Sequence, residues 1–201
     1  MKRVKLVVAY DGTNYCGWQV QKNGETIESV LNRAIGELTG EEIHVMGSSR
    51  TDAGVHACGN VAVFDTEARM AADKFSYALN QRLPEDIRIQ DSCEVPADFH
   101  PRFQKTVKTY EYRILNREFP LPAYRFNSHF TYRKLDVERM RQAAAYLIGE
   151  HDFQSFCVAG AQVKTTVRTI YALDVEKQGA ILPRLIWWDN GVIFQIDQIL
   201  Y

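Results

Sequence analysis

The chain of 201 residues is long enough to bury a substantial core and to form one domain or two small ones. Its 46% hydrophobic and 24% charged residues are typical of a soluble globular protein, and a net charge of −1 gives no overall indication of an anionic partner. The apolar run near the start, "VKLVVAY", becomes polar too soon for a secretory signal or a membrane span. We therefore expect a cytoplasmic protein that does not contact a membrane.

The first half of the chain is predicted to contain six elements in the order β-α-β-β-α-β, the split pattern of ferredoxin-like folds. In chain order these are a strand over 4–10, a helix over 26–40, strands over 42–49 and 60–66, a helix over 71–83 and a strand over 86–95. Thr26 is a plausible N-cap of the first helix and Gly40 lies just past its end. The loop over 11–25 is too long for a simple turn, and long ordered loops are more often functional than connective.

After Pro96 the pattern begins again but does not finish. Strands are predicted over 107–115, 125–132, 165–177 and 191–200, with a helix over 136–149. The stretch "GAILPRLIWWD", residues 179–189, has no obvious place in the repeat. We predict an α+β fold of two ferredoxin-like halves, residues 1–98 and 99–201, that share an antiparallel sheet, with the second half incomplete.

The basic residues are unevenly distributed along the chain. Residues 36–98 carry twelve acids against five Lys or Arg, whereas residues 99–134 carry eight Lys or Arg against two acids. The second segment is either a contact for phosphate or a solvated basic strand face.

The cysteines and histidines do not indicate a metal site. Cys16, Cys58, Cys93 and Cys157 form no CxxC pair, so neither zinc nor a disulfide framework is expected.

The motif "GSSRTDAGVHA", residues 47–57, lies between two predicted strands and carries a cation and an anion two residues apart. An Asp in such a loop is most often a turn former. Arg50, however, is close enough to pair with Asp52 and keep its carboxylate ionised, and Gly54 would allow backbone or substrate to approach closely. An ionised carboxylate beside a guanidinium can act as a nucleophile, a base or an electrostatic stabiliser.

The decapeptide "SSRTDAGVHA" closely resembles the signature of TruA-like tRNA pseudouridine synthases, which modify uridines of the anticodon stem-loop. The segments "YDGTNYCGWQVQKNGETIESVLNRAI", "DFHPRFQKTVKTYEYRI" and "GEHDFQSF" resemble other parts of the same family. The resemblance extends from about Val4 to about Glu176. It implies two α/β halves around a continuous antiparallel sheet, a central cleft with the motif at its floor, no cofactor, no metal, and a homodimer that holds tRNA.

The resemblance also implies roles for single residues. Asp52 falls on the family's essential aspartate, taken as the nucleophile, which could attack C6 of the uracil or assist cleavage at the sugar. Arg50 falls on the arginine that pairs with this aspartate and helps fill the space of the flipped base. Tyr110 falls on the tyrosine that stacks on the target uracil; without the resemblance, a sheet-face aromatic is the simpler interpretation.

The basic segment then has a natural partner. Lys105 and Lys108 interleave with aromatic residues, a mixture suited to backbone phosphates and a splayed-out base. His100 and Arg102 are weaker candidates, and for His100 a hydrogen-bonded core histidine is the favoured interpretation. His56 and His151 are interpreted as structural.

The end of the chain departs from the family pattern. The family continues with a segment of the type "FLYxMVR", whose basic residue joins the catalytic pair, whereas this chain runs "DNGVIFQIDQILY". We therefore expect a truncated second half.

The leading hypothesis is an isomerase that converts uridine to pseudouridine at about positions 38 to 40 of tRNA. Its alternatives are a non-catalytic RNA-binding or tRNA-folding module, or a truncated inactive synthase. A carboxylate-based glycosidase is disfavoured because no second acid accompanies Asp52 in the motif.

Overall fold

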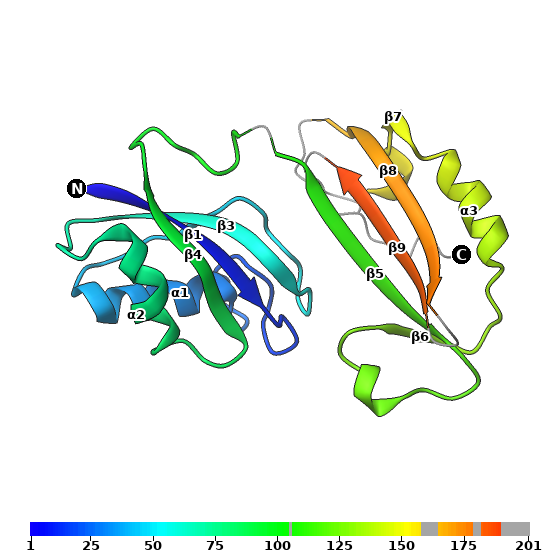
Figure 1. The fold of residues 1–201 in the computed structure, drawn as a ribbon, viewed down its shortest axis with the longest axis horizontal. Coiled ribbons are helices and arrows are strands. Elements are labelled where there is room, and N and C mark those ends of the chain that lie inside the picture. The colour runs from blue at the N-terminus through cyan, green and yellow to red at the C-terminus, as the bar shows by residue number, and fades with distance from the viewer. Residues whose placement is uncertain (105, 158–164, 179–181, 190–201) are drawn as a thin grey trace. The chain divides into compact units, whose positions relative to one another are not determined.

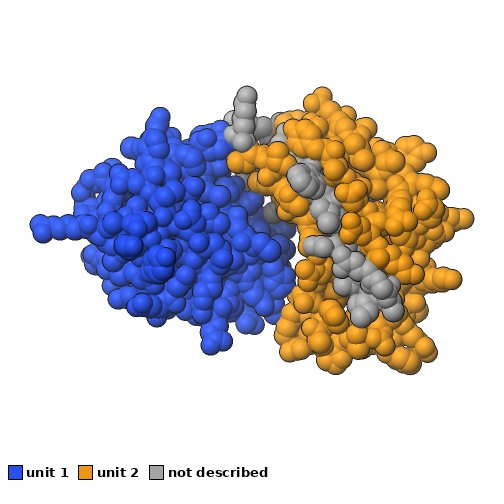
Figure 2. All heavy atoms as spheres, viewed as in Figure 1, with its two compact units in different colours: residues 1–104 blue, residues 105–201 orange. Residues whose placement is uncertain are grey.

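The computed structural model describes residues 1–104, 106–157, 165–178 and 182–189. The chain divides into two compact units, residues 1–104 and 105–201, each of which is described by itself (Figure 2). The sequence-based boundary followed residue 98, and residues 99–104 lie in unit 1.

Unit 1 is built on a four-stranded sheet in the order β2-β3-β1-β4, in which every pair is antiparallel (Figure 1). The strands are β1 (Lys2–Tyr10), β2 (Met46–Gly47), β3 (Ala57–Thr66) and β4 (Ile87–Val95). Because β1 has a partner on each side, the start of the chain supplies a central strand of the sheet.

The helices of unit 1 are α1 (Ile27–Thr39) and the short α2 (Phe75–Asn80), which a 3₁₀ turn over Ala72–Lys74 precedes. The predicted caps of α1 are confirmed. Thr26 accepts a hydrogen bond from the N–H of Ser29 at 3.2 Å, and Gly40 ends the helix with a φ of 75°.

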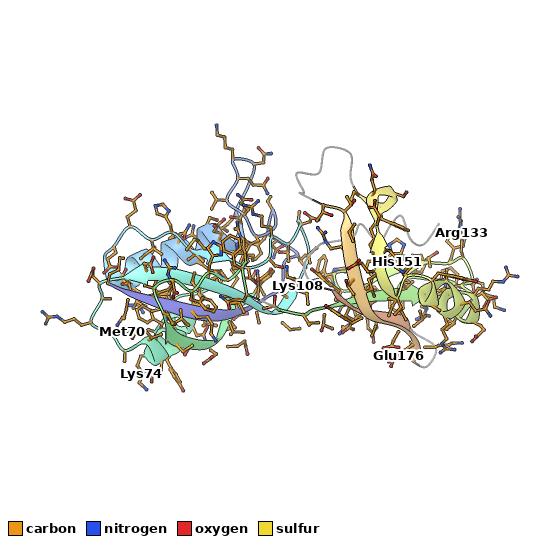
Figure 3. The ribbon with its side chains drawn as sticks, turned by 90° about the horizontal axis from the view of Figure 1, so that it is seen from above. Met70, Lys74, Lys108, Arg133, His151 and Glu176 are labelled. Atoms are coloured by element: carbon orange, nitrogen blue, oxygen red, sulfur yellow. The ribbon has the colours of Figure 1, made fainter. Side chains whose placement is uncertain are left out.

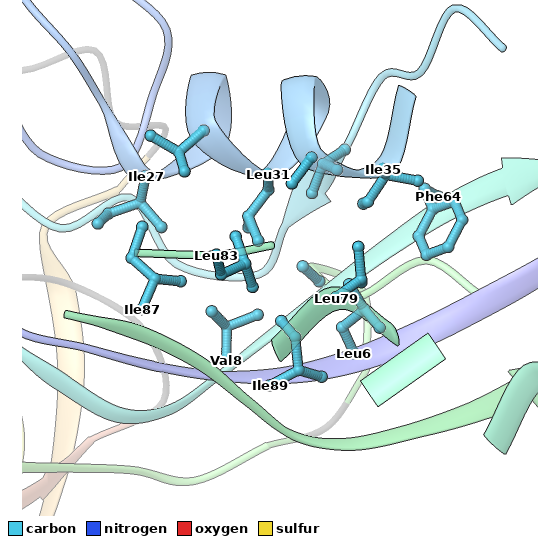
Figure 4. Close-up of a cluster of buried hydrophobic side chains, with 14 of the residues drawn as sticks. Leu6, Val8, Ile27, Leu31, Ile35, Phe64, Leu79, Leu83, Ile87 and Ile89 are labelled. Carbon is cyan, nitrogen blue, oxygen red and sulfur yellow. The ribbon is translucent and has the colours of Figure 1, made fainter. Parts of the chain in front are cut away.

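The core of unit 1 lies between the helices and one face of the sheet. Val4, Leu6 and Val8 alternate along β1 and are fully buried in one cluster with α1, α2, β3 and β4. Figure 4 shows side chains of β1, β4 and both helices meeting there. Both helices therefore cover the same face of the sheet.

Two predicted elements of unit 1 are shorter than expected. The strand predicted over 42–49 pairs only at β2, because the N–H of Val45 donates to Oδ1 of Asn32 on α1 at 2.8 Å instead of joining a ladder. The alternating apolar residues Ile43 and Val45 are still buried. The helix predicted over 71–83 ends as α2 at Asn80, whose side-chain amide bonds both the N–H and the C=O of Ile89 in β4.

Unit 2 contains a five-stranded sheet in the order β6-β5-β9-β8-β7. Its elements are β5 (Lys108–Asn116), β6 (His129–Thr131), α3 (Val137–Ala145), β7 (Gly149–Asp152), β8 (Val167–Gln178) and β9 (Leu182–Asp189). The pairs are antiparallel except β5 with β6, which is parallel. The side chain of Asp136 caps α3, as predicted, by accepting from the N–H groups of Glu138 and Arg139.

The main difference from the sequence prediction is β9. The stretch that had no place in the repeat supplies a strand between β5 and β8. Its apolar residues are interrupted by Pro183 and Arg184 and do not alternate with polar residues, as they would in a strand with one solvent-exposed face. Pro183 lies near the start of β9, where a missing N–H is best tolerated.

The mixed α/β character agrees with the prediction, and so does the antiparallel pairing of all the described strand pairs except β5 with β6. The described strands form a four-stranded sheet in unit 1 and a five-stranded sheet in unit 2. The strand predicted over 191–200 lies outside the described residues.

We expect Leu6→Ala to lower the free energy of unfolding by about 2–5 kcal/mol, because the lost methyl groups leave a cavity under α1. The control is Lys5→Ala on the opposite face of the same strand, which should change it by no more than about 0.5 kcal/mol. Urea denaturation measures both, and equal losses would contradict the placement of the core.

Candidate active site

The motif loop begins at β2 and is held at its start by a buried asparagine. Asn60 on β3 is only 7% exposed. Its Oδ1 accepts from the hydroxyl of Ser48 at 3.0 Å and from the N–H of Ser49 at 3.3 Å, while its Nδ2 donates to the carbonyl of Ser49 at 3.1 Å. The amide of Asn60 therefore fixes the two serines that precede Arg50.

The other side of the motif loop is bonded to the loop between β1 and α1. The N–H of Trp18 donates to the carbonyl of Thr51 at 2.9 Å, and the N–H of Gly54 donates to the carbonyl of Tyr15 at 3.3 Å. The hydroxyls of Tyr10 and Thr51 are 2.8 Å apart. These contacts bracket Asp52 on both sides.

Two glycines make this close approach possible. A Cβ at Gly12 would lie 2.0 Å from the carbonyl oxygen of Val55, and one at Gly17 would lie 2.5 Å from that of Thr51. Gly17 also has a φ of +83°. At Gly54 an added Cβ would meet nothing within 4 Å, so its φ of +79°, and not close approach, is the reason for glycine there.

The contact between the loops is extended by α1. The first N–H groups of a helix have no partner within it. Here the N–H of Ile27 donates to the carbonyl of Gly17 at 3.1 Å, and that of Glu28 to the carbonyl of Trp18 at 3.0 Å. The start of α1 thus holds the loop that in turn holds the motif.

A pocket of about 330 Å³ opens beside the motif loop. It is lined by Cys16, Gln19, Val20, Gln21, Arg50, Thr51, Asp52 and Ala53. The two loops therefore bring the predicted Arg50 and Asp52 together in one concave site.

The expected ion pair between Arg50 and Asp52 is not formed. Within the described ranges of the chain, no ion pair up to 4.0 Å joins these two side chains. Both residues are exposed, so water can solvate each charge without a partner.

Asp11 and His56 form a second charged contact, at the C-terminal end of the motif. Oδ1 of Asp11 accepts from the hydroxyl of Thr13 at 2.5 Å and from its N–H at 3.0 Å, and lies 3.0 Å from Nδ1 of His56. These hydrogen bonds, with a smaller contribution from the charge of His56, lower the pKa of Asp11. The contact ties the end of β1 to the end of the motif.

The remaining predicted site residues belong to unit 2. Lys108 and Tyr110 lie on β5, and Tyr110 is half-buried against the hydrophobic cluster of unit 2. Figure 3 labels Lys108 among the side chains of this unit. Lys105 lies outside the described residues. The structure therefore groups Arg50 with Asp52, and Lys108 with Tyr110.

In the part of the chain that the structure describes, no group of three or more His, Cys, Asp or Glu side chains could hold a metal ion. No helix among these residues is long and apolar enough to cross a membrane.

The comparisons with known proteins decide the family. A family model described as tRNA pseudouridine synthase matches residues 6–104 and 143–193. The tRNA pseudouridine synthase A of Acetivibrio thermocellus is 46% identical over 200 residues, which cover all of this chain and 82% of the relative. The protein of the same name from Thermoanaerobacter sp. (strain X514) is 48% identical over 201 residues, with the same coverage of both chains.

The chain belongs to the tRNA pseudouridine synthase family.

This membership confirms the resemblance that the motif predicted, and it makes the chain a member of a family of isomerases whose substrate is tRNA. The sequence alone did not identify Asn60, Gly12 or Gly17 as residues that shape the site. The only signal was the length of the loop over 11–25, which indicated a functional role without showing which residues served it.

We expect Gly12→Ala to displace the motif loop and to lower both stability and activity, because its Cβ would overlap the backbone carbonyl of Val55. Gly59→Ala is the matched control, since its Cβ would lie 3.3 Å from a methyl group of Val7 that can adjust. Thermal unfolding and pseudouridine formation are measured for both variants. Equal melting temperatures and equal rates would contradict the close contact between the motif loop and the loop that carries Gly12.

The pKa of Asp11 predicts a pH dependence. Because it lies below the unfolded value of about 4, the stability from this carboxylate is fully present above about pH 4 and is lost as the pH falls through the folded pKa. Asp11→Asn should therefore be less stable than wild type at about pH 6, and the difference should shrink below about pH 4. Urea denaturation across this range tests it; a difference that does not change with pH would refute it.

Proposed function

We propose that this chain converts uridine to pseudouridine in the anticodon stem-loop of tRNA, at about positions 38 to 40, with Asp52 as the nucleophile. The observation that carries the proposal is the pocket of about 330 Å³ that Arg50 and Asp52 line together. Its volume lies near the lower end of the range for small-ligand sites, about 300–1,000 Å³, and suits a single extruded base.

The reaction needs no external reagent. The bond between N1 and C1′ of the nucleoside breaks, a bond between C5 and C1′ forms, and the proton on C5 is replaced by one on N1. The Asp52 carboxylate assists either by adding to C6 of the uracil or by attacking C1′ of the sugar. Both routes regenerate the free carboxylate, so the enzyme ends unchanged.

Arg50 supports base extrusion. Flipping a base costs a few kcal/mol of lost stacking, and a planar guanidinium can occupy part of the vacated space. The exposure of Arg50 and its place in the pocket wall leave it available for this role. The carboxylate and the guanidinium would then act on the substrate separately, with no need for the ion pair.

Unit 2 would supply the remaining contacts. We assign Tyr110 to stacking on the target uracil and Lys105 and Lys108 to backbone phosphates of the tRNA. The position of Lys108 and Tyr110 at the start of one strand supports this grouping.

The finer architecture belongs to the same proposal. The element order of unit 1 and its sheet order β2-β3-β1-β4 support a ferredoxin-like half. A homodimer that holds tRNA and a cytoplasmic location, without cofactor or metal, complete the proposed enzyme.

We expect Asp52→Asn to reduce the single-turnover rate of pseudouridine formation by on the order of 10⁴-fold or more while tRNA binding persists. The matched control is Asp91→Asn, an exposed aspartate on β4, which should keep the wild-type rate. The measurement maps pseudouridine in an unmodified tRNA transcript.

An Asp52→Asn variant with the wild-type rate would remove the assigned role. A wild-type protein that binds tRNA without forming any product would instead favour the non-catalytic RNA-binding module.

A further inference from the structure

The segment after β4 folds back onto the motif. Residues 99–104 belong to unit 1, and within them Nε of Arg102 donates to the carbonyl of Gly47 in β2 at 3.0 Å. Gly47 is the first residue of the motif. The hydrogen bond therefore places a second guanidinium beside the strand that leads to Arg50 and Asp52.

The turn that carries Arg102 is well anchored. The N–H of Phe103 donates to the carbonyl of His100 at 3.1 Å, and the N–H of Arg102 to Nδ1 of His100 at 3.2 Å. Before the turn, the carbonyl of Phe99 accepts from Nη1 of Arg3 at 2.9 Å. Arg3 on β1 is itself fixed by two hydrogen bonds to the carboxylate of Asp65, so the turn is tied to the centre of the sheet.

The surroundings of Arg102 suit an anion. Partial burial lowers its pKa, and repulsion from Arg50 adds to this effect, while Glu28 opposes it. Among the described residues, the side chain of Arg102 makes no hydrogen bond other than the one to Gly47, so its two Nη groups can bind a ligand. An anion near both guanidinium groups would relieve their repulsion.

Phe103, the residue that follows Arg102 in the chain, carries an exposed aromatic ring. Phe103 is 81% exposed, and its ring stacks on that of His100 at 4.2 Å between centroids and 22° between planes. His100 supports one face of the ring and leaves an apolar surface toward solvent. A basic residue and an exposed aromatic ring on the same turn are a combination that can bind a phosphate and an unstacked base of single-stranded RNA.

We propose that Arg102 and Phe103 form a second RNA subsite beside the pocket, where Arg102 binds a backbone phosphate next to the target uridine and Phe103 stacks on an unpaired base. This inference rests on the proposed function. Both are positioning residues, because they hold the RNA and do not touch the reacting atoms.

The test measures tRNA affinity as a function of salt, together with kcat and KM, for Arg102→Gln and Phe103→Ala. Loss of one phosphate contact should reduce the slope of log affinity against log salt by about 0.7–0.9 in Arg102→Gln. Phe103→Ala should weaken binding by about 5- to 150-fold with the slope unchanged. Both should raise KM and leave kcat at saturating tRNA close to the wild-type value.

Two controls keep the result specific. Arg69→Gln removes an exposed arginine that follows the opposite end of β3 from the motif, and it should keep the wild-type affinity and slope. Arg102→Lys keeps the positive charge and should keep most of the wild-type salt slope, whereas Arg102→Gln should not; a residue that only holds the backbone would leave the slope unchanged in both variants.

An Arg102→Gln variant with the slope and KM of Arg69→Gln, or a Phe103→Ala variant with wild-type affinity, would overturn the subsite. Failure of the proposed function gives a different result, because the wild-type protein would then form no pseudouridine. The binding measurements decide the subsite in either case.

Discussion

The backbone hydrogen bond from Trp18 to Thr51 is the contact on which the site depends. It joins the loop that follows the central strand β1 to the motif loop that precedes β3, the neighbour of β1 in the sheet. Asp52 directly follows Thr51 in the chain. Because Gly12 and Gly17 have no side chains, the backbones approach closely enough to bond. The carboxylate is thus positioned mainly by main-chain atoms, which vary less in position than long side chains.

The surrounding structure makes this contact rigid. Trp18 is only 1% exposed, and an added Cβ at Gly47 would lie 2.4 Å from its indole ring, so the start of the motif rests directly on that ring. The start of α1 holds the backbone of the same loop, and Asn60 holds the two serines. The motif loop that lines the pocket is therefore held by buried residues of the core and by the sheet. Such a rigid site suits a reaction in which a nucleobase must be held in a fixed orientation.

The sequence predicts those features that local patterns determine. The alternation of buried and less buried residues predicts β1, and the capping residues Thr26 and Gly40 predict the ends of α1. Both signals lie in or directly beside the element that they predict. It does not predict the short β2, because a side chain of α1 takes the N–H that a strand would use. The strand β9 was missed because its apolar run shows no period.

The candidate site was predicted to a similar extent. The motif predicted Arg50 and Asp52 as site residues, and the family membership confirms the resemblance that the motif carries. The residues that position them, Gly12, Gly17 and Asn60, lie in other segments, so only the folded backbone shows their role. The ion pair expected between Arg50 and Asp52, two described residues, is absent because residues that are close in sequence need not bring their solvated side chains into contact.

Amide hydrogen exchange of Trp18 tests the central claim most directly, because its N–H makes the bond that joins the two loops. The account predicts exchange as slow as that of the central β1 amides, since breaking the bond requires the two loops to separate. Exchange as fast as that of an exposed loop amide such as Asn23 would contradict it, because the motif loop would then not be held against the loop that carries Trp18.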